Sequence, residues 1–211
     1  MIISHKHRFA YFSPVGNCGT TTITKALLIH HDDNEVCQDY EFNFSHPKNV
    51  RKENCAIVNK HIRPHDFAIA FPKKWEEIMG YDLISSCRDP FDVFASFLFK
   101  NYTRGPVTIT SNLVLHACSL REYDLTRFGQ VGSLEVKNIM PLRMAFKFES
   151  LSDNLNDFLK SIDDYETQVT HEEKHSFSKS SYRDFYDKSG EEAIREIFKK
   201  DFSLGYDENL V

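Results

Sequence analysis

The chain has 211 residues, 41% of them hydrophobic, and a formal net charge of −5 at pH 7. That length and hydrophobic content predict a single domain over residues 1–211 with a sizeable core, and a negative charge without a basic run argues against a nucleic-acid surface. The five cysteines are irregularly spaced and include no CxxC pair, so we expect reduced thiols and no metal site. Since the sequence has no run of about 18 apolar residues and no secretory leader pattern, we expect a cytoplasmic protein that does not span a membrane.

The first third of the chain predicts two strands and two helices. Residues 8–12 are a short apolar run typical of a buried strand, and a helix is expected from Thr20 or Thr21 to His31. Residues 55–59 predict a second strand, and residues 63–71 predict a short helix with proline in its first turn.

The middle of the chain predicts one strand followed by two helices. Residues 81–87 predict a third strand, and residues 89–102 a helix with Asp89 as its cap and Pro90 at its first position. Helical spacing predicts that three apolar side chains of this helix face the core: Phe94, Phe97 and Leu98. A further helix is expected over residues 110–122.

The last third of the chain predicts a strand and two helices. After a loop over residues 124–141, residues 143–149 predict a fourth strand and residues 150–162 a helix. Ser150 and Asp153 have the spacing of a capping box at the start of that helix. A final helix is expected over residues 190–202.

Alternating strands and helices predict an α/β fold with a central, mainly parallel sheet between helix layers. In such sheets ligands bind beyond the carboxyl ends of the strands. The residues to examine are therefore those that follow the predicted strands: the loop 14–22, Lys60, His61, Arg88 and Glu149.

The first of these segments, GNCGTTT, combines glycines and hydroxyl side chains at a predicted helix start. It consists of Gly16, Asn17, Cys18, Gly19, Thr20, Thr21 and Thr22. The amides and dipole of a helix N-terminus favour an anion such as a phosphate. Gly19 is followed by threonine rather than lysine, so the Walker A pattern is not met, which disfavours an ATP- or GTP-hydrolysing loop. A glycine turn capped by threonine, with no ligand, is the alternative interpretation.

The second segment, SSCRDPFDVFASF over residues 85–97, places Arg88 at the end of a strand and Ser96 in the following helix. Arginine binds a phosphate with a bidentate pair of hydrogen bonds, and a nearby hydroxyl could complete such a site. In the alternative interpretation Arg88 pairs with Asp89 or Asp92, and Ser96 is a small packing residue.

Together these segments resemble the sulfotransferase superfamily, whose members use 3′-phosphoadenosine 5′-phosphosulfate (PAPS). Gly19, Thr21 and Thr22 match the family's first loop, PKxGxTS, and Arg88, Pro90 and Ser96 match its second motif, RxPxxxxxS. The segments FKFESL (146–151) and YRDFYDKSGEEAIREIFKKDFSLGY (182–206) are similar to the family's late strand-to-helix segment and its C-terminal stretch. The resemblance covers nearly the whole chain and is closest to the carbohydrate-type branch and its bacterial relatives. It implies a P-loop-like three-layer fold, with the loop 16–22 on the 5′-phosphosulfate and Arg88 and Ser96 on the 3′-phosphate.

The chain departs from the family's pattern at Asn17, which stands where the loop lysine is expected. Asparagine donates a hydrogen bond but brings no charge, and loss of one preorganised donor at a transition state can cost a factor of about 10²–10³ in rate. Lys25 and Lys60 are candidates to supply the missing cation, although Lys25 could equally face solvent.

The candidate general base is His61, because histidine has a pKa suited to removing a proton at neutral pH and His61 directly follows a predicted strand. The resemblance implies the same role for His61, and the alternative is a histidine that only bonds a loop backbone. His65 is the second choice, although one helical turn later it is expected on the helix surface. The resemblance also implies that Lys179, supported by Ser178, Ser180 and Arg183, closes over the 3′-phosphate. The remaining histidines near the predicted helix and strand ends are expected in solvent: His5, His7, His30 and His31.

The resemblance therefore implies a PAPS-dependent sulfotransferase that transfers a sulfuryl group to a hydroxyl or amine of a small-molecule or carbohydrate acceptor, and we expect no metal. Two alternatives stay open. Asn17 is consistent with a catalytically degenerate nucleotide-binding member of the same fold, and an irregular phosphate loop is consistent with a small-molecule kinase. The acceptor and the oligomeric state are not encoded in any recognisable pattern.

Overall fold

The computed structural model describes residues 1–13, 18–30, 62–119, 142–170, 182–202 and 206. Residue contacts divide the chain into two compact units. Unit 1 consists of Met1–Ser86 with Leu134–His171, and unit 2 consists of Cys87–Ser133 with Glu172–Val211. In the part of the chain that the structure describes, no helix has the length and apolar character needed to cross a membrane.

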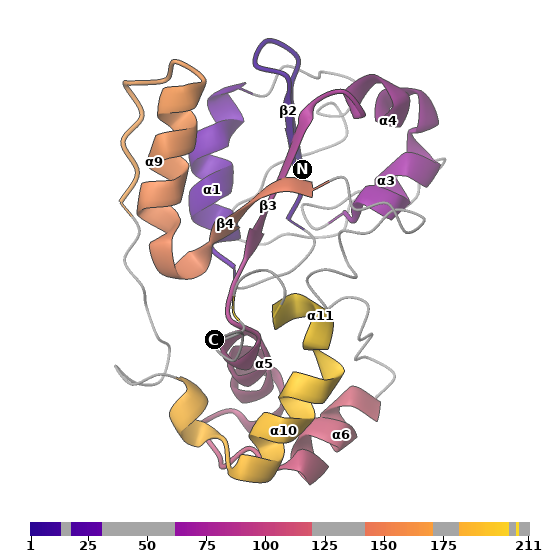
Figure 1. The fold of residues 1–211 in the computed structure, drawn as a ribbon, viewed down its shortest axis with the longest axis vertical. Coiled ribbons are helices and arrows are strands. Elements are labelled where there is room, and N and C mark those ends of the chain that lie inside the picture. Colours follow the sequence, from indigo (N-terminus) through magenta and orange to yellow (C-terminus); the bar gives the residue numbers. More distant parts are fainter. Residues whose placement is uncertain (14–17, 31–61, 120–141, 171–181, 203–205, 207–211) are drawn as a thin grey trace. The chain divides into compact units, whose positions relative to one another are not determined.

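Unit 1 is built on a four-stranded, largely parallel sheet in the order β1-β2-β3-β4 (Figure 1). Strand β1 (Ile2–Ser4) pairs antiparallel with β2 (Phe9–Tyr11), and β2 pairs parallel with β3 (Asp82–Cys87). Strand β4 (Leu142–Lys147) completes the order. The strands predicted over 8–12, 81–87 and 143–149 are confirmed as β2, β3 and β4. The strand predicted over 55–59 lies outside the described residues, and β1 is an additional strand.

Helices cover both faces of this sheet. On one face lie α1 (Thr20–Leu27), which continues as the 3-10 turn η1 (Leu28–His30), and α9 (Leu151–Ser161). On the other face lie α3 (Pro64–Ala70) and α4 (Pro72–Ile78). The predicted α/β class, with helices flanking the sheet, is therefore confirmed for unit 1.

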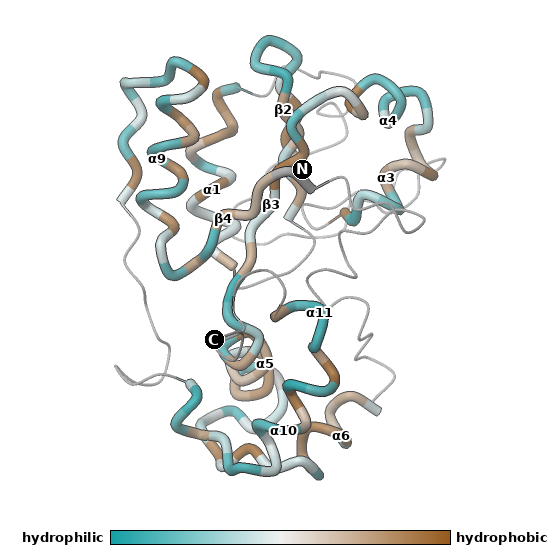
Figure 2. Tube along the Cα trace, in the orientation of Figure 1, coloured by the Kyte–Doolittle hydropathy of each residue, from teal (hydrophilic) through white to brown (hydrophobic). Residues whose placement is uncertain are grey.

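The alternation of side chains along the strands produces these two faces, because successive residues of a strand point to opposite sides. One core, shared with α1 and α9, receives Ile2, Phe9, Tyr11 and Ile84. The other core, shared with α3 and α4, receives Ile3, Ala10, Phe12 and Leu83. Hydrophobic and hydrophilic residues alternate around α9, as expected for a helix that packs on a sheet with one face (Figure 2).

The start of α9 corrects one prediction. Ser150 is the N-cap residue, but its side chain makes no capping hydrogen bond. Its Oγ instead donates to Oδ1 of Asn154 at 3.1 Å, and the same oxygen accepts the amide of Lys147 at 3.2 Å. The capping box predicted from Ser150 and Asp153 is therefore wrong, because Asn154 competes for the Ser150 hydroxyl.

Unit 2 is helical and has an aromatic core. Its elements are α5 (Pro90–Leu98), the π-helical turn η2 (Phe99–Thr103), α6 (Ser111–Ser119), the 3-10 turn η4 (Tyr182–Phe185), α10 (Lys188–Ile197) and α11 (Lys199–Phe202). Asp89 caps α5 and Pro90 occupies its first turn, as predicted. Phe94 and Leu98 are buried in the core and Phe97 packs against it, also as predicted. The helix predicted over 190–202 is instead two helices, because the chain departs from helical geometry at Phe198.

Candidate functional site

The start of α1 is the described part of the predicted phosphate loop. Gly19 is its N-cap residue and has a left-handed backbone with φ of +71°. No side chain caps this helix, and its first turn contains no acidic residue. The first amides of any helix lack intrahelical acceptors. The positive end of α1 is therefore not neutralised by a side chain of its own first turn, which suits it to an anion.

The left-handed backbone and the close packing both favour glycine at position 19. A Cβ atom built there would overlap Cδ2 of Leu151 and lie 3.5 Å from Cδ2 of Phe148. Leu151 and Phe148 belong to FKFESL, the third segment that the sequence analysis singled out. The structure thus brings two separate motifs into contact within unit 1.

The hydroxyl side chains of α1 have different environments. Thr20 is buried, and its Oγ1 shares a hydrogen bond of 2.9 Å with Oγ of Ser13, two residues beyond the end of β2. Thr21 is exposed and Thr22 is half-buried, so these two are the threonines that solvent can reach. Cys18 is fully buried, whereas Lys25 is exposed on the helix surface.

Arg88 lies in unit 2 and has charged and aromatic neighbours there. Its guanidinium pairs with Asp92 at 3.0 Å, and its side chain is 6% exposed. The guanidinium also lies over the ring of Tyr182, 5.6 Å from the centroid, which is a cation–π geometry. Asp89 instead accepts the amide of Phe91 at 2.8 Å as the cap of α5. Of the two acidic partners considered for Arg88, the structure therefore pairs it with Asp92.

Ser96 is buried in α5, two turns beyond Arg88 along the chain. Tyr182 belongs to the C-terminal segment that the sequence analysis singled out, so the structure also brings the arginine motif and that segment into contact. Arg183 of the same segment is half-buried with its guanidinium 5.0 Å from the centroid of the Phe91 ring. The importance of Tyr182 could not be read from spacing alone, because it depends on a contact between residues 94 positions apart.

Several predicted site residues lie outside the described residues. These are Gly16, Asn17, Lys60, His61, Ser178, Lys179 and Ser180. Their predicted roles stay predictions. His65 is described and is half-buried in the first turn of α3.

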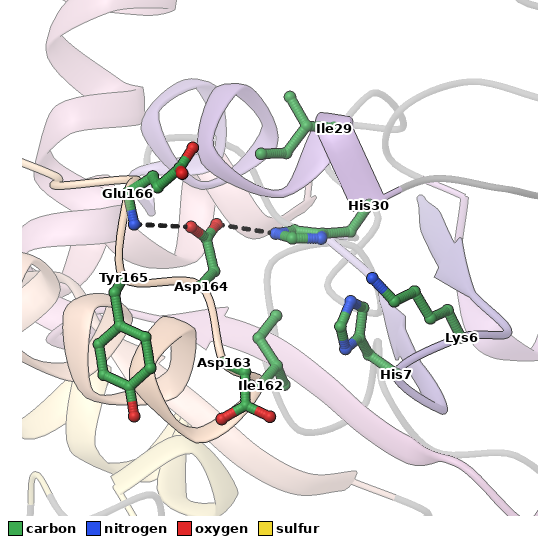
Figure 3. Close-up of a pocket in the computed structure, with 9 residues that line it drawn as sticks. All are labelled: Lys6, His7, Ile29, His30, Ile162, Asp163, Asp164, Tyr165 and Glu166. Atoms are coloured by element: carbon green, nitrogen blue, oxygen red, sulfur yellow. Dashed lines mark hydrogen bonds and ion pairs between the residues drawn. The ribbon is translucent and has the colours of Figure 1, made fainter.

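One prediction about the histidines is wrong. His30 was expected in solvent, but its side chain is only 12% exposed, and its Nε2 lies 2.9 Å from Oδ2 of Asp164 (Figure 3). This pair lies at a surface hollow of about 510 Å³ in unit 1, which Lys6 and His7 also line. Tertiary contact causes the difference, because Asp164 is 134 residues away in sequence. Among the described residues, no group of three or more histidine, cysteine or acidic side chains could hold a metal ion.

Comparisons of the chain with models of protein families, with curated proteins and with solved structures found no match. Two separate groups of described residues are candidates for binding an anion. One is the start of α1 in unit 1, and the other is the surroundings of Arg88 in unit 2.

Proposed function

We propose that this chain is a PAPS-dependent sulfotransferase with a P-loop-like arrangement of β2, the loop 14–22 and α1. The observation that carries the proposal is the start of α1. A buried strand leads to a helix whose first residue is a threonine, whose cap is a glycine that cannot be replaced without overlap, and whose first turn lacks acidic residues. This combination favours a bound anion at that end of the helix.

The residues around Arg88 fit a second phosphate group. A guanidinium provides five N–H donors in a planar fork that matches a phosphate. Asp92 and Tyr182 contact this guanidinium and hold its orientation, which reduces the entropy lost when a ligand binds. Ser96 is buried in α5, the helix that contains Asp92, and would provide a hydroxyl.

The proposal assigns roles to residues of this chain as follows. Thr21, Thr22 and the first amides of α1 would bind the 5′-phosphosulfate, and Arg88 and Ser96 would bind the 3′-phosphate. Lys179 would contact the same 3′-phosphate. When bound, PAPS would supply the sulfuryl group. The acceptor's hydroxyl or amine would form a bond to sulfur as the bond from sulfur to the phosphate oxygen breaks, and His61 would take the acceptor's proton. Positioning and charge stabilisation would supply most of the rate, as in phosphoryl transfer.

Asn17 favours a second candidate function, in which the chain has the same fold and binds a nucleotide but catalyses no transfer. The neutral amide cannot neutralise charge on the leaving oxygen as a lysine would. In the enzyme hypothesis Lys25 or Lys60 must supply this charge. The exposed Lys25 side chain is long and flexible enough to change direction, whereas Lys60 lies outside the described residues. A small-molecule kinase is a weaker candidate, because no lysine follows Gly19.

The test is a titration of the purified protein with adenosine 3′,5′-bisphosphate, ADP and ATP, monitored by thermal unfolding. A specific ligand at about 100 times its dissociation constant adds about 2.7 kcal/mol to the free energy of unfolding. We expect selective stabilisation by the 3′,5′-bisphosphate. No response to any nucleotide would refute the proposal, and a magnesium-dependent preference for ATP would favour the kinase.

Two variants separate binding from turnover. His61→Ala should abolish sulfuryl transfer while the affinity for adenosine 3′,5′-bisphosphate is kept. Asn17→Lys should raise turnover if the loop lacks only a charge. If the natural chain binds the nucleotide and neither it nor Asn17→Lys transfers a sulfuryl group, the binding protein without turnover is the correct alternative.

The start of α1 can be tested with a matched pair of variants. Thr21→Ala should weaken binding of the 3′,5′-bisphosphate, because it removes an exposed hydroxyl from the first turn. Thr170→Ala removes an exposed hydroxyl elsewhere in unit 1 and should leave the affinity unchanged. Equal affinity of both variants would count against the assignment of Thr21.

A further inference from the structure

A row of buried hydroxyl groups runs beneath the start of α1 in unit 1. Tyr11 is 1% exposed, and its phenol shares a hydrogen bond of 3.4 Å with Oγ of Ser86 at the end of β3. Ser13 lies close enough to the phenol to lower the pKa of Tyr11 as a hydrogen-bonding neighbour. Ser13, 1% exposed, in turn bonds Thr20, the first residue of α1. These four residues form the hydroxyl row: Ser86, Tyr11, Ser13 and Thr20.

Strand geometry explains why the row exists. Tyr11 and Ser13 are two residues apart, so both side chains point to the face of the sheet on which α1 lies. The neighbouring Ser85 points to the opposite face and donates to the carbonyl of Phe12 at 2.6 Å. The row therefore connects the ends of two neighbouring strands to the first turn of one particular helix.

The row is not what core packing alone requires. A phenylalanine at position 11 would fill nearly the same volume and would need no polar partner. Burying a hydroxyl costs free energy unless it is hydrogen-bonded, so each member of the row depends on the others. Burial raises the pKa of Tyr11 to about 12, although its hydrogen bonds with Ser13 and Ser86 oppose that rise. The phenol therefore keeps its proton at neutral pH and can donate throughout the physiological range.

The row also reaches the segment of unit 1 to which the proposed function assigns the 5′ phosphate group, because Ser13 bonds Thr20, the first residue of α1. We infer that Tyr11 and Ser13 are positioning residues, which hold the start of α1 in the orientation that binds the 5′ phosphate group. This inference rests on the proposed function, since it concerns the affinity of the start of α1 for the same nucleotide.

The variants Tyr11→Phe and Ser13→Ala test the inference, because each removes one oxygen and keeps most of the side chain. Tyr81→Phe is the matched control. The phenol of Tyr81 shares a hydrogen bond of 2.9 Å with Nδ1 of His5. Tyr81 immediately precedes β3, so it lies at the opposite end of that strand from Ser86. Tyr11→Phe and Ser13→Ala should each weaken binding of adenosine 3′,5′-bisphosphate about fivefold to tenfold, the equivalent of one hydrogen bond. Tyr81→Phe should leave the dissociation constant unchanged.

A second measurement does not depend on the ligand. The amide of Ile23 makes the first hydrogen bond within α1, to the carbonyl of Gly19 at 3.1 Å. Its hydrogen exchange should be faster in Tyr11→Phe and Ser13→Ala than in the natural chain, and unchanged in Tyr81→Phe. Unchanged exchange in all three variants would overturn the inference. If the natural chain binds the nucleotide, an unchanged affinity in Tyr11→Phe and Ser13→Ala would also overturn it.

The two proposals fail in distinguishable ways. If the natural chain binds no nucleotide while Tyr11→Phe and Ser13→Ala still accelerate exchange at Ile23, the proposed function is wrong and the positioning of α1 by the row is supported. If the natural chain binds and only the stability of the variants falls, equally in Tyr11→Phe and Tyr81→Phe, the row is structural and the inference is wrong.

Discussion

The starts of α1 and α5 differ in how their positive ends are satisfied. At α5, Asp89 caps the helix, Asp92 lies in the first turn, and Asp92 also pairs with the buried Arg88. At α1, the cap is Gly19, which has no side chain to offer, and the first turn contains only threonines and an isoleucine. The helix that begins unit 2 thus carries acidic side chains at its own positive end, whereas the first turn of α1 contains none. This difference makes the start of α1 the stronger candidate for an anion, whereas the guanidinium of Arg88 is already paired with Asp92 of α5.

The largest effect is expected at Gly19. Gly19→Ala forces a left-handed backbone on alanine and introduces a Cβ that overlaps Leu151, so the free energy of unfolding should fall by about 3 kcal/mol. The control is Gly105→Ala, where nothing lies within 4 Å of the added atom and the change should be within about 0.5 kcal/mol. Urea unfolding measures both. Equal stability of the two variants would mean that the start of α1 is not constrained as described.

The next effect is expected at Asp92. Asp92→Asn keeps an oxygen near Arg88 but removes the negative charge from a largely buried pair, so the free energy of unfolding should fall by about 2 kcal/mol. Asp157→Asn is the control, since Asp157 and Lys160 form an exposed pair at 3.8 Å whose loss should cost less than about 0.5 kcal/mol. Comparable losses in the two variants would contradict the view that α5 depends on Asp92 for its charge balance.

A smaller effect is expected for the cap of α5. Asp89→Ala removes the acceptor of the Phe91 amide and should lower the free energy of unfolding by about 1 kcal/mol. Thr21→Ala, in the first turn of α1, removes no cap and should change stability by less than about 0.3 kcal/mol. If Thr21→Ala proves as destabilising as Asp89→Ala, the start of α1 is capped within the chain, and the comparison between the two helices fails.

The smallest effect concerns the other end of α1, where η1 ends at His30. Burial by itself would raise the pKa of Asp164, but hydrogen bonds from Thr167 and His30 outweigh burial and lower that pKa below its ordinary value of 3.8. Because the folded-state pKa is the lower one, this stabilisation is fully present above about pH 4 and is lost as the pH falls through the folded pKa.

Asp164→Asn should therefore flatten the acid side of the stability profile, measured by urea unfolding between about pH 5 and pH 2. His30→Gln removes one of the hydrogen bonds and should flatten the profile less. Slopes identical to that of the natural chain in both variants would show that the pair does not bind α1 to the turn after α9.

Periodicity and turn chemistry in the sequence determined the fold class and most of the elements. The apolar runs at 8–12, 81–87 and 143–149 are strands, and proline marks the starts of α3 and α5, because these signals act over a few residues. The prediction of a capping box at Ser150 was wrong because the side chain of Asn154 accepts the hydrogen bond of the Ser150 hydroxyl. A sequence pattern does not show which of two nearby side chains forms the bond.

Only the tertiary structure decided which side chains are neighbours. It paired His30 with Asp164, Arg88 with Tyr182 and Tyr11 with Ser86, each across more than seventy residues of sequence. Gly19 is constrained by Leu151 in the same way. The physical reason is that charge, hydroxyl and ring contacts depend on which strand ends and helix starts the sheet brings together. The sequence shows which groups are able to interact, and the packing of the chain determines which of them are in contact.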